Sequence, residues 1–338
     1  MNERKSKILY SIIQDFIYTG EPVGSRTLSR KYNLGISSAT IRNEMSDLEE
    51  LGFLEQVHIS SGRRPSNKGY RLYVDKLMKP KQISNEEKKY IESNLLNLDL
   101  FDFENILKSK LSLISKLTNL ACVLKIPSVI ENSIKSIEFI EISTYSLLAV
   151  IITNEGIIRN NIIKLNRIID HKSISVINKI INDHCISRRF EDIDLDLVWE
   201  SVQCLNLDRN IFDQLILILR NLFMYDTEAS YYFEGIDNIL SYPEFNSIDK
   251  VRELVCFFNN INRFNGLLNC DCGNNIQIKI GEENSIEEAK NYSVVLGNCI
   301  RNGKVLGTIG IIGLTRMDYA KIVTMVKFLI DFINTNID

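Results

Sequence analysis

Hydrogen-bond donors without any carboxylate gather in one short stretch of the sequence, between residues 37 and 43. The stretch supplies hydroxyl, guanidinium and amide groups from Ser37, Ser38, Thr40, Arg42 and Asn43. The acidic residues nearby all follow it, at positions 44, 47, 49 and 50. Such donors suit phosphate oxygens and the acceptor atoms of base edges, and acids close by would oppose both contacts. The solvated face of an ordinary amphipathic helix carries similar groups, so this stretch alone fits both interpretations equally.

A second group of donors follows in a loop, from Ser61, Gly62, Arg63 and Arg64. Glycine lets a backbone approach a phosphate closely, and arginines can reach phosphates or the narrow minor groove. The alternative is a solvated loop that holds two arginines by chance, but its position after the donor-rich stretch favours a nucleic-acid contact. Two more cations complete the set of expected contacts: Arg26, and Lys68 as the expected phosphate contact.

The elements that must position these donors can be inferred from the spacing of apolar residues. Helical spacing predicts four helices, over residues 3–18, 26–31, 37–51 and 67–78. A tight turn at residues 33–35 separates the second from the third, and residues 53–57 have the composition of a strand. Helix, short helix, tight turn and helix is the order of a helix-turn-helix, and the arginine loop takes the position of its wing.

Charge is distributed unevenly along the chain of 338 residues. Residues 1–81 contain 14 lysines and arginines against 9 acidic residues, whereas the whole chain has a net charge of −3. The first part is therefore basic and the remainder is acidic. This asymmetry is typical of a nucleic-acid reader joined to a separate control module.

Other functional classes find little support in the sequence. It contains no nucleophile elbow, phosphate loop or metal-ligand cluster, so we expect no catalytic residues, no cofactor and no metal. No apolar run is long enough to span a bilayer and the start does not resemble a signal peptide, so we expect a cytoplasmic protein without membrane partners. The seven cysteines lack a repeated spacing, and we expect them to be free in a reducing compartment.

The remainder of the chain alternates between helical and strand-like patterns, which indicates an α+β fold. Apolar spacing predicts helices over residues 84–96, 103–120, 171–183, 209–224 and 316–333. Strand-like segments lie at residues 121–126, 134–142, 146–153, 157–165, 275–280, 292–300 and 304–312. The helix over 209–224 is apolar on more than one side, which suits either a core or a subunit interface.

Several blocks make this sequence similar to the family of heat-inducible transcription repressors HrcA. In the basic first part they are residues 20–28 (GEPVGSRTL), 35–45 (GISSATIRNEM) and 69–75 (GYRLYVD). In the acidic remainder they are 236–240 (IDNIL) with 243–245 (PEF), 280–284 (IGEEN), and 307–310 (GTIG) with 315–319 (TRMDY). One departure is Leu314, where the family usually has proline. Residues 84–232 match only weakly.

The resemblance implies an N-terminal winged helix-turn-helix domain over residues 1–80. A GAF-like domain would follow over 81–133 and 233–338, interrupted by an inserted α+β dimerisation domain over 134–232. The family resemblance further implies binding, as a homodimer, to double-stranded DNA at an inverted-repeat operator (the CIRCE element) upstream of chaperonin and DnaK-type genes. It also implies that the chaperonin GroEL maintains the active repressor and that heat relieves repression.

A second function stays open, a winged-helix regulator that responds to a metabolite bound in the GAF-like domain. Such folds hold small molecules in other proteins, although the sequence contains no pocket motif that names one. For the repressor, we expect Arg42→Ala or Asn43→Ala to lower the discrimination between operator and random DNA. Arg63→Ala should instead weaken binding to both and flatten its salt dependence.

Overall fold

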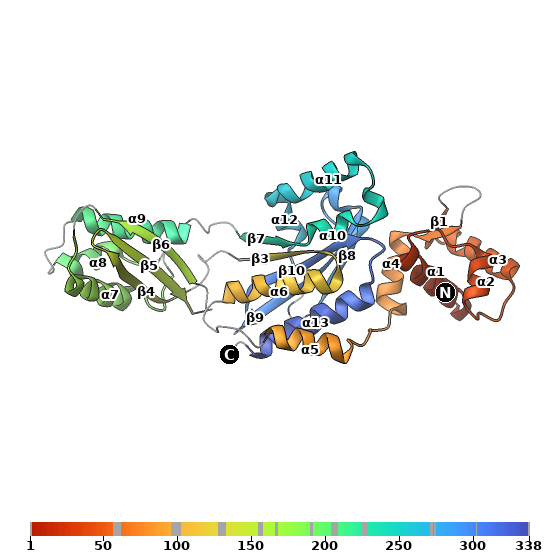
Figure 1. Ribbon diagram of the computed structural model, residues 1–338, viewed down its shortest axis with the longest axis horizontal. Coiled ribbons are helices and arrows are strands. Elements are labelled where there is room, and N and C mark those ends of the chain that lie inside the picture. Colours follow the sequence, from red (N-terminus) through yellow and green to blue (C-terminus); the bar gives the residue numbers. More distant parts are fainter. Residues whose placement is uncertain are drawn as a thin grey trace.

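The computed structural model describes residues 2–56, 62–95, 103–127, 133–154, 158–165, 168–189, 192–203, 209–224, 229–270, 273, 275–301 and 303–336. The chain has three parts, each built on a sheet of its own (Figure 1). We call residues 2–78 the N-terminal module and residues 133–224 the outer module. Residues 81–127 together with 229–336 form the central module, which lies between the other two.

The N-terminal module packs helices against a two-stranded antiparallel sheet. In chain order its elements are α1 (Glu3–Thr19), α2 (Ser25–Lys31), α3 (Ser38–Glu50), β1 (Leu54–Gln56), β2 (Arg63–Pro65), α4 (Asn67–Leu72) and a π-helical turn, η1 (Tyr73–Leu77). The side chain of Asn2 accepts from the backbone N–H of Lys5 and so caps α1, which ends at Gly20 in the left-handed conformation that favours glycine. The four helices expected from apolar spacing are confirmed.

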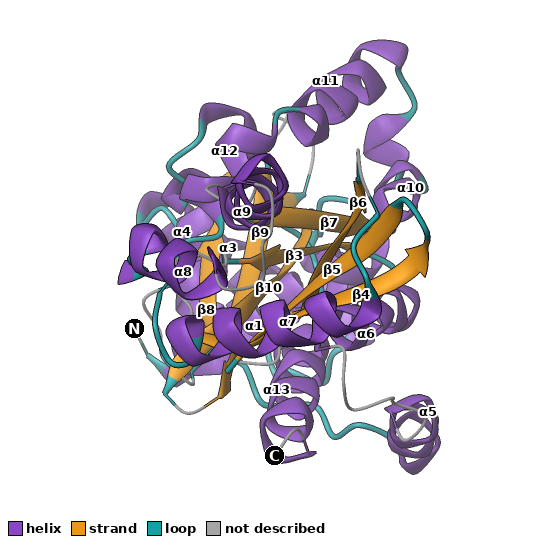
Figure 2. Cartoon of the chain, turned by 90° about the vertical axis from the view of Figure 1, so that its left-hand side faces the viewer, coloured by secondary structure: helices purple, strands orange, loops and turns teal. Residues whose placement is uncertain are grey.

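The central module is a five-stranded antiparallel sheet with helices on both faces (Figures 1 and 2). Its strands, in spatial order, are β7 (Ser230–Glu234), β3 (Ala121–Ile126), β10 (Lys304–Leu314), β9 (Tyr292–Arg301) and β8 (Gln277–Ile280). One face packs on α6 (Phe103–Thr118) and α13 (Tyr319–Asn336), with α5 (Asn85–Leu95) on the same side. The opposite face packs on α10 (Ile236–Leu240), α11 (Ile248–Asn259) and α12 (Ile261–Leu267).

The outer module is inserted between β3 and β7, which are hydrogen-bonded neighbours in the central sheet. The chain therefore leaves the central sheet and returns to it at one place. The module's own sheet has the order β4 (Ile134–Ser143), β5 (Ser146–Thr153) and β6 (Ile158–Lys164). One face of this sheet forms a core with α7 (His171–Cys185), α8 (Leu195–Val202) and α9 (Arg209–Met224). The other face carries three side chains that are at least half exposed: Ile140, Ile142 and Ile162.

The expected α+β content is confirmed, although four helices and one strand of the central and outer modules were not predicted. The strands expected at 134–142 and 146–153 and the helices expected at 171–183 and 209–224 are all present. Helices α8, α10 and α12 and strand β7 were not predicted, because short elements give too few apolar positions to define a period. Helix α11 was also not predicted, although it spans 12 residues and its buried Leu254, Phe257 and Phe258 have helical spacing. The hairpin turn expected around residues 154–156 falls largely outside the described residues.

The cysteines and the helices bear on two further expectations. Cys122, Cys185 and Cys299 are buried and free, whereas Cys270 is disulfide-bonded, which corrects the expectation that all seven are free. No helix that the structure describes is both long and apolar enough to cross a bilayer.

Candidate nucleic-acid interface

Helix α3 turns one side to solvent because its apolar residues share the other. Ile41, Met45 and Leu48 follow helical spacing and are buried in the N-terminal module. The side chain of Ser37 accepts from the backbone N–H of Thr40, 3.1 Å away, and so caps the helix. The capping residue confirms where the third helix begins.

The five donors expected in the first half of α3 are all at least partly exposed: Ser37, Ser38, Thr40, Arg42 and Asn43. Arg42 and Asn43 are fully in the exposed class. Within the described part of the chain, neither has a side-chain hydrogen bond or ion pair. Both side chains therefore remain available to a ligand, and the partial positive charge of the helix N-terminus adds to the charge of Arg42.

Three of the four acids in the second half of α3, Glu44, Asp47 and Glu49, are paired with cations of the same module. Glu44 lies 3.5 Å from the guanidinium of Arg4, and Asp47 lies 2.8 Å from the ammonium of Lys5, both on α1. These two carboxyl groups are thus held against α1 and are neutralised there. A polyanion that approaches the first half of α3 meets less repulsion than the sequence alone implies.

Strand β2 carries the two arginines expected in the wing, and each has an ionic partner. Arg63 Nε lies 2.7 Å from Glu49 Oε2 on α3. Arg64 Nε lies 3.1 Å from Glu55 Oε2 on β1. Successive side chains of a strand point to opposite faces, so the two guanidinium groups serve different neighbours. Ser61, the other side chain expected here, lies outside the described residues.

Gly62 is required by the fold for a reason that the sequence did not indicate. The backbone N–H groups of Val23 and Arg63 each donate to the other's carbonyl oxygen, at 2.9 Å. This bridge presses the chain at Pro22 and Val23 against Gly62, where a Cβ atom would lie 2.5 Å from the Val23 carbonyl. The close approach that needs glycine is therefore between two segments of this chain.

Three cations outside α3 differ in whether other groups of the described chain bind them. The Lys68 ammonium donates to the carbonyl oxygen of Leu51 at 2.9 Å and lies over the ring of Phe53, so it secures the end of α3. Arg26 is exposed on α2, without a partner among the described residues. Arg30 is likewise exposed on α2 without a partner among the described residues, but the sequence analysis did not predict it as a DNA contact. Its i, i+4 spacing from Arg26 was the available signal.

The N-terminal module is held to the central module by an ion pair and hydrogen bonds around the blocks 69–75, 280–284 and 315–319, a contact that we call the joint. Arg71 forms a two-pronged contact with the carboxylate of Glu283 and donates to the carbonyl oxygen of Ile278 at 2.7 Å. Lys81 pairs with Asp318 just before α13 and donates to the hydroxyl of Tyr18 on α1 at 2.9 Å. These contacts fix α4 against β8 and the turn that follows it.

Arg316 is the most buried cation of the joint, with its whole residue 9% exposed. Its guanidinium contacts both carboxylate oxygens of Glu244, at 2.5 and 2.9 Å, and donates to the carbonyl oxygen of Ile17 at 3.4 Å. Burial opposes ionisation of Glu244, but the hydrogen bonds and charge of Arg316, a backbone hydrogen bond and the charge of Lys250 together outweigh it and hold the pKa of that carboxyl below its usual value. The turn around Arg316 forms with Leu314 in place of proline, because the Met317 N–H donates to the Leu314 carbonyl.

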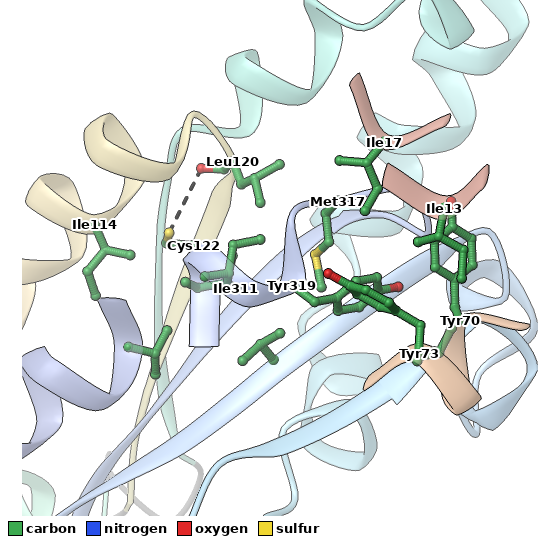
Figure 3. Close-up of a cluster of buried hydrophobic side chains, with 14 of the residues drawn as sticks. Ile13, Ile17, Tyr70, Tyr73, Ile114, Leu120, Cys122, Ile311, Met317 and Tyr319 are labelled. Carbon is green, nitrogen blue, oxygen red and sulfur yellow. Dashed lines mark hydrogen bonds between the residues drawn. The ribbon is translucent and has the colours of Figure 1, made fainter. Parts of the chain in front are cut away.

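Apolar packing joins the two modules behind these ion pairs (Figure 3). A single cluster runs from Ile13 and Ile17 on α1, through Tyr70 and Tyr73, to Tyr319 and the central sheet. The ring centres of Tyr70 and Tyr319 are 5.7 Å apart. Because this cluster is continuous, the orientation of α3 relative to the central sheet is set by buried contacts rather than by a free linker.

Comparison with known proteins relates the whole chain to one group of regulators. Residues 104–323 match the family model described as the HrcA protein C terminal domain. The chain is 43% identical, over all of its length and 98% of the relative's, to the heat-inducible transcription repressor HrcA of Clostridium acetobutylicum. It is 41% identical to that of Clostridium tetani, over 98% of this chain and 94% of the relative.

A solved structure has the same fold. It is described as the crystal structure of a hypothetical protein at 2.2 Å resolution, and superposes with a TM-score of 0.69 over 99% of this chain and 98% of its own. The sequences are 21% identical. At that identity the likeness extends to the fold alone.

Proposed function

The chain belongs to the family of heat-inducible transcription repressors HrcA, and we propose from this premise that it binds an inverted-repeat DNA operator as a homodimer. In this proposal residues 1–80 are the winged helix-turn-helix domain that reads DNA. Residues 81–133 and 233–338 are a GAF-like domain, and residues 134–232 are an inserted dimerisation domain. The operator is of the CIRCE type, upstream of chaperonin and DnaK-type genes.

One observation supports DNA reading above the others. The first half of α3 is exposed and free of acids, and its Arg42 and Asn43 have no side-chain partner among the described residues. Arginine pairs with the O6 and N7 atoms of guanine, and asparagine pairs with the N6 and N7 atoms of adenine, in the major groove. A helix that enters the groove by its N-terminal end brings these two side chains to base edges. Arg26 and Arg30 on α2 would then contact the phosphate backbone.

The dimer proposal rests on the open face of the outer module's sheet. Ile140 on β4, Leu148 on β5 and Ile162 on β6 are paired across the three strands, so they form one apolar row on that face. Ile140 is 50% exposed and Ile162 is 59% exposed in the single chain. Two copies of such a row can pack on each other about a two-fold axis, which would place two α3 helices at the two half-sites of a palindrome.

The proposal also includes regulation by GroEL and by heat, and this part rests on family membership. We infer that GroEL maintains the operator-binding form and that heating relieves repression. Gel shifts with a CIRCE-type inverted repeat and a scrambled repeat, each with and without GroEL, test both parts. We expect a preference for the intact repeat that GroEL increases. Equal binding to both DNAs would exclude the operator proposal, and a preference that GroEL leaves unchanged would exclude only the GroEL part.

The dimer is tested separately by light scattering of the Ile140→Lys and Ile162→Lys variants. A charge in the apolar row should convert dimers to monomers, because it would be buried without a partner at the interface. Lys164→Glu, on the same strand but with an already charged residue, is the matched control and should remain dimeric. Unchanged dimers in both isoleucine variants would exclude this face.

A further inference from the structure

A cavity of about 340 Å³ lies between the N-terminal and central modules, beside the joint. Its walls come from β1, β2 and α4 on one side and from the segment 244–253, the start of β9 and the end of β10 on the other. It is therefore distinct from any pocket within the central module, where the metabolite of the alternative function was expected. A molecule in this cavity would touch the DNA-reading module and the central module at once.

The cavity wall includes a buried hydroxyl without a partner. Tyr70 is 1% exposed, and its hydroxyl has no hydrogen bond to any part of the chain that the structure describes. Burial raises the pKa of this hydroxyl well above its usual value, and the positive charges of Arg316 and Arg64 act in the opposite sense. Both arginines also line the cavity. A neutral hydroxyl in the same cavity wall as these cations can donate a hydrogen bond to an anionic acceptor.

One cation of the cavity wall has no ion pair and can bind an anion. Four cations line it, Arg64, Lys250, Lys290 and Arg316, against three carboxylates, Glu55, Glu244 and Glu253. Each arginine is paired with one of the carboxylates. Lys290 pairs with Glu287, which does not line the cavity, and Lys250 has no ion pair among the described residues. The pairs therefore leave one lining cation, Lys250, and one lining carboxylate, Glu253, without an ion pair among the described residues.

We propose that this cavity is a binding site for a small oxyanion, a phosphate or a carboxylate, which accepts a hydrogen bond from the Tyr70 hydroxyl and is neutralised by Lys250 and Arg64. The hydrogen bond satisfies a buried polar group that otherwise lacks a partner. The anion contacts Tyr70 and Arg64 from one module and Lys250 from the other, so its binding stabilises their docked arrangement.

Arg64 connects this site to DNA, a step that rests on the proposed function. Arg64 is one of the cations expected in the wing, and half of its side chain is exposed. An anion in the cavity engages the same guanidinium that would otherwise approach a phosphate of the operator. Occupancy of the cavity therefore weakens operator binding, and by linkage operator DNA weakens anion binding by the same factor.

Isothermal titration of the full-length protein with inorganic phosphate, and separately with citrate, tests the site at constant ionic strength kept with chloride. We expect saturable binding of at least one of the two, and the stronger one identifies the phosphate or the carboxylate class. Tyr70→Phe should weaken that binding about tenfold or more, because the lost hydrogen bond goes to a charged group. Lys250→Ala should weaken it several-fold.

Tyr73→Phe is the matched control, because it removes one hydroxyl from a buried tyrosine three residues away that does not line the cavity. The Tyr73 hydroxyl accepts from Gln14 at 2.9 Å, so its loss should lower the melting temperature but leave anion binding unchanged. Tyr70→Phe should leave the melting temperature of the anion-free protein unchanged or higher. No saturable binding of either anion, or equal binding by the Tyr70→Phe variant and the parent, would overturn the proposal.

Operator binding is then measured with and without the bound anion. We expect the anion to raise the Kd of the parent for operator several-fold and to leave the Kd of Tyr70→Phe unchanged. An equal rise in both would overturn the link to DNA. A parent without any operator preference would instead count against the proposed function, and the titration would still decide the anion site.

Discussion

The first half of α3 and the strand β2 both carry donors that the sequence marks as DNA contacts, yet they differ in how free those donors are. On α3, Arg42 and Asn43 are exposed and have no partner within the described residues. On β2, Arg63 and Arg64 are each held by a glutamate of the same module. The difference shows that a cationic sequence motif supplies charge, whereas its neighbours in the fold decide whether that charge can reach a ligand.

The secondary structure explains the difference. The apolar residues of α3 lie along one side, so the other side meets only solvent. The strand β2 lies between α3 and the cavity beside the central module, and alternate side chains meet a neighbour on each face. Arg63 therefore acts on α3 through Glu49, as a residue that positions this helix.

The largest effect should come from Gly62→Ala, which tests how tightly the strand is built into the fold. The added Cβ would lie 2.5 Å from the Val23 carbonyl, so the bridge between Val23 and Arg63 must open. We expect a loss of about 3 kcal/mol in the free energy of unfolding, measured in urea. Gly35→Ala, with a left-handed φ but no atom within 4 Å of the added Cβ, should lose only about 1 kcal/mol. Equal losses of unfolding free energy in the two variants would show that the contacts around Gly62 constrain β2 less than the structure indicates.

The second-largest effect should be on the preference for operator DNA over scrambled DNA. Arg42→Ala should lower the preference for operator over scrambled DNA by about 2 kcal/mol, because a free guanidinium can read a base edge. Arg64→Ala should leave that preference unchanged, since its side chain faces Glu55 and the cavity. Gel shifts at one fixed salt concentration compare the two. A larger loss of preference in Arg64→Ala than in Arg42→Ala would reverse the comparison.

A smaller effect should appear in a double-mutant cycle between Arg63 and Glu49. Their side chains are mostly buried and 2.7 Å apart, so we expect a coupling free energy of about 0.5–1 kcal/mol in urea unfolding. The cycle between Arg42 and Glu49 is the control and should give a coupling within about 0.3 kcal/mol of zero. If the Arg63 cycle also gives zero, Arg63 is free to contact DNA, as the sequence reasoning expected.

The smallest effect should be a change in protein stability at acid pH. It extends the comparison to Arg316, an arginine whose guanidinium is bound by Glu244 in the joint. The pKa of Glu244 is lowered in the folded protein, so its contribution is present above the pKa of the unfolded chain, about 4.3. That contribution is lost as the pH falls through the lower folded value. Glu244→Gln should therefore flatten the decline in stability below about pH 4. Glu253→Gln, which removes a carboxyl that pairs with no described cation, is the control, and identical acid profiles for both variants would contradict the role of Arg316.

Much of the fold and part of the site could be predicted from the sequence. Periodic apolar residues located the helices of the N-terminal module and most longer elements, because burying one side of an element demands that period. The acid-free run from Ser37 to Asn43 could be identified because all its residues lie on one helix. Arg30 was missed although its spacing from Arg26 was visible. The partners of Arg63, Arg64 and Lys68 could not be predicted, because each comes from a different element.

The sequence by itself therefore determined which segments form helices and strands, where positive charge accumulates, and the family to which the chain belongs. Only the tertiary structure decided which of those charges are free. It paired Arg63 with Glu49, required Gly62 at the crossing of two chain segments, and placed Tyr70 between two modules beside a cavity. The physical reason is that local patterns record burial along one element, whereas hydrogen bonds and ion pairs depend on distances between elements that only packing sets.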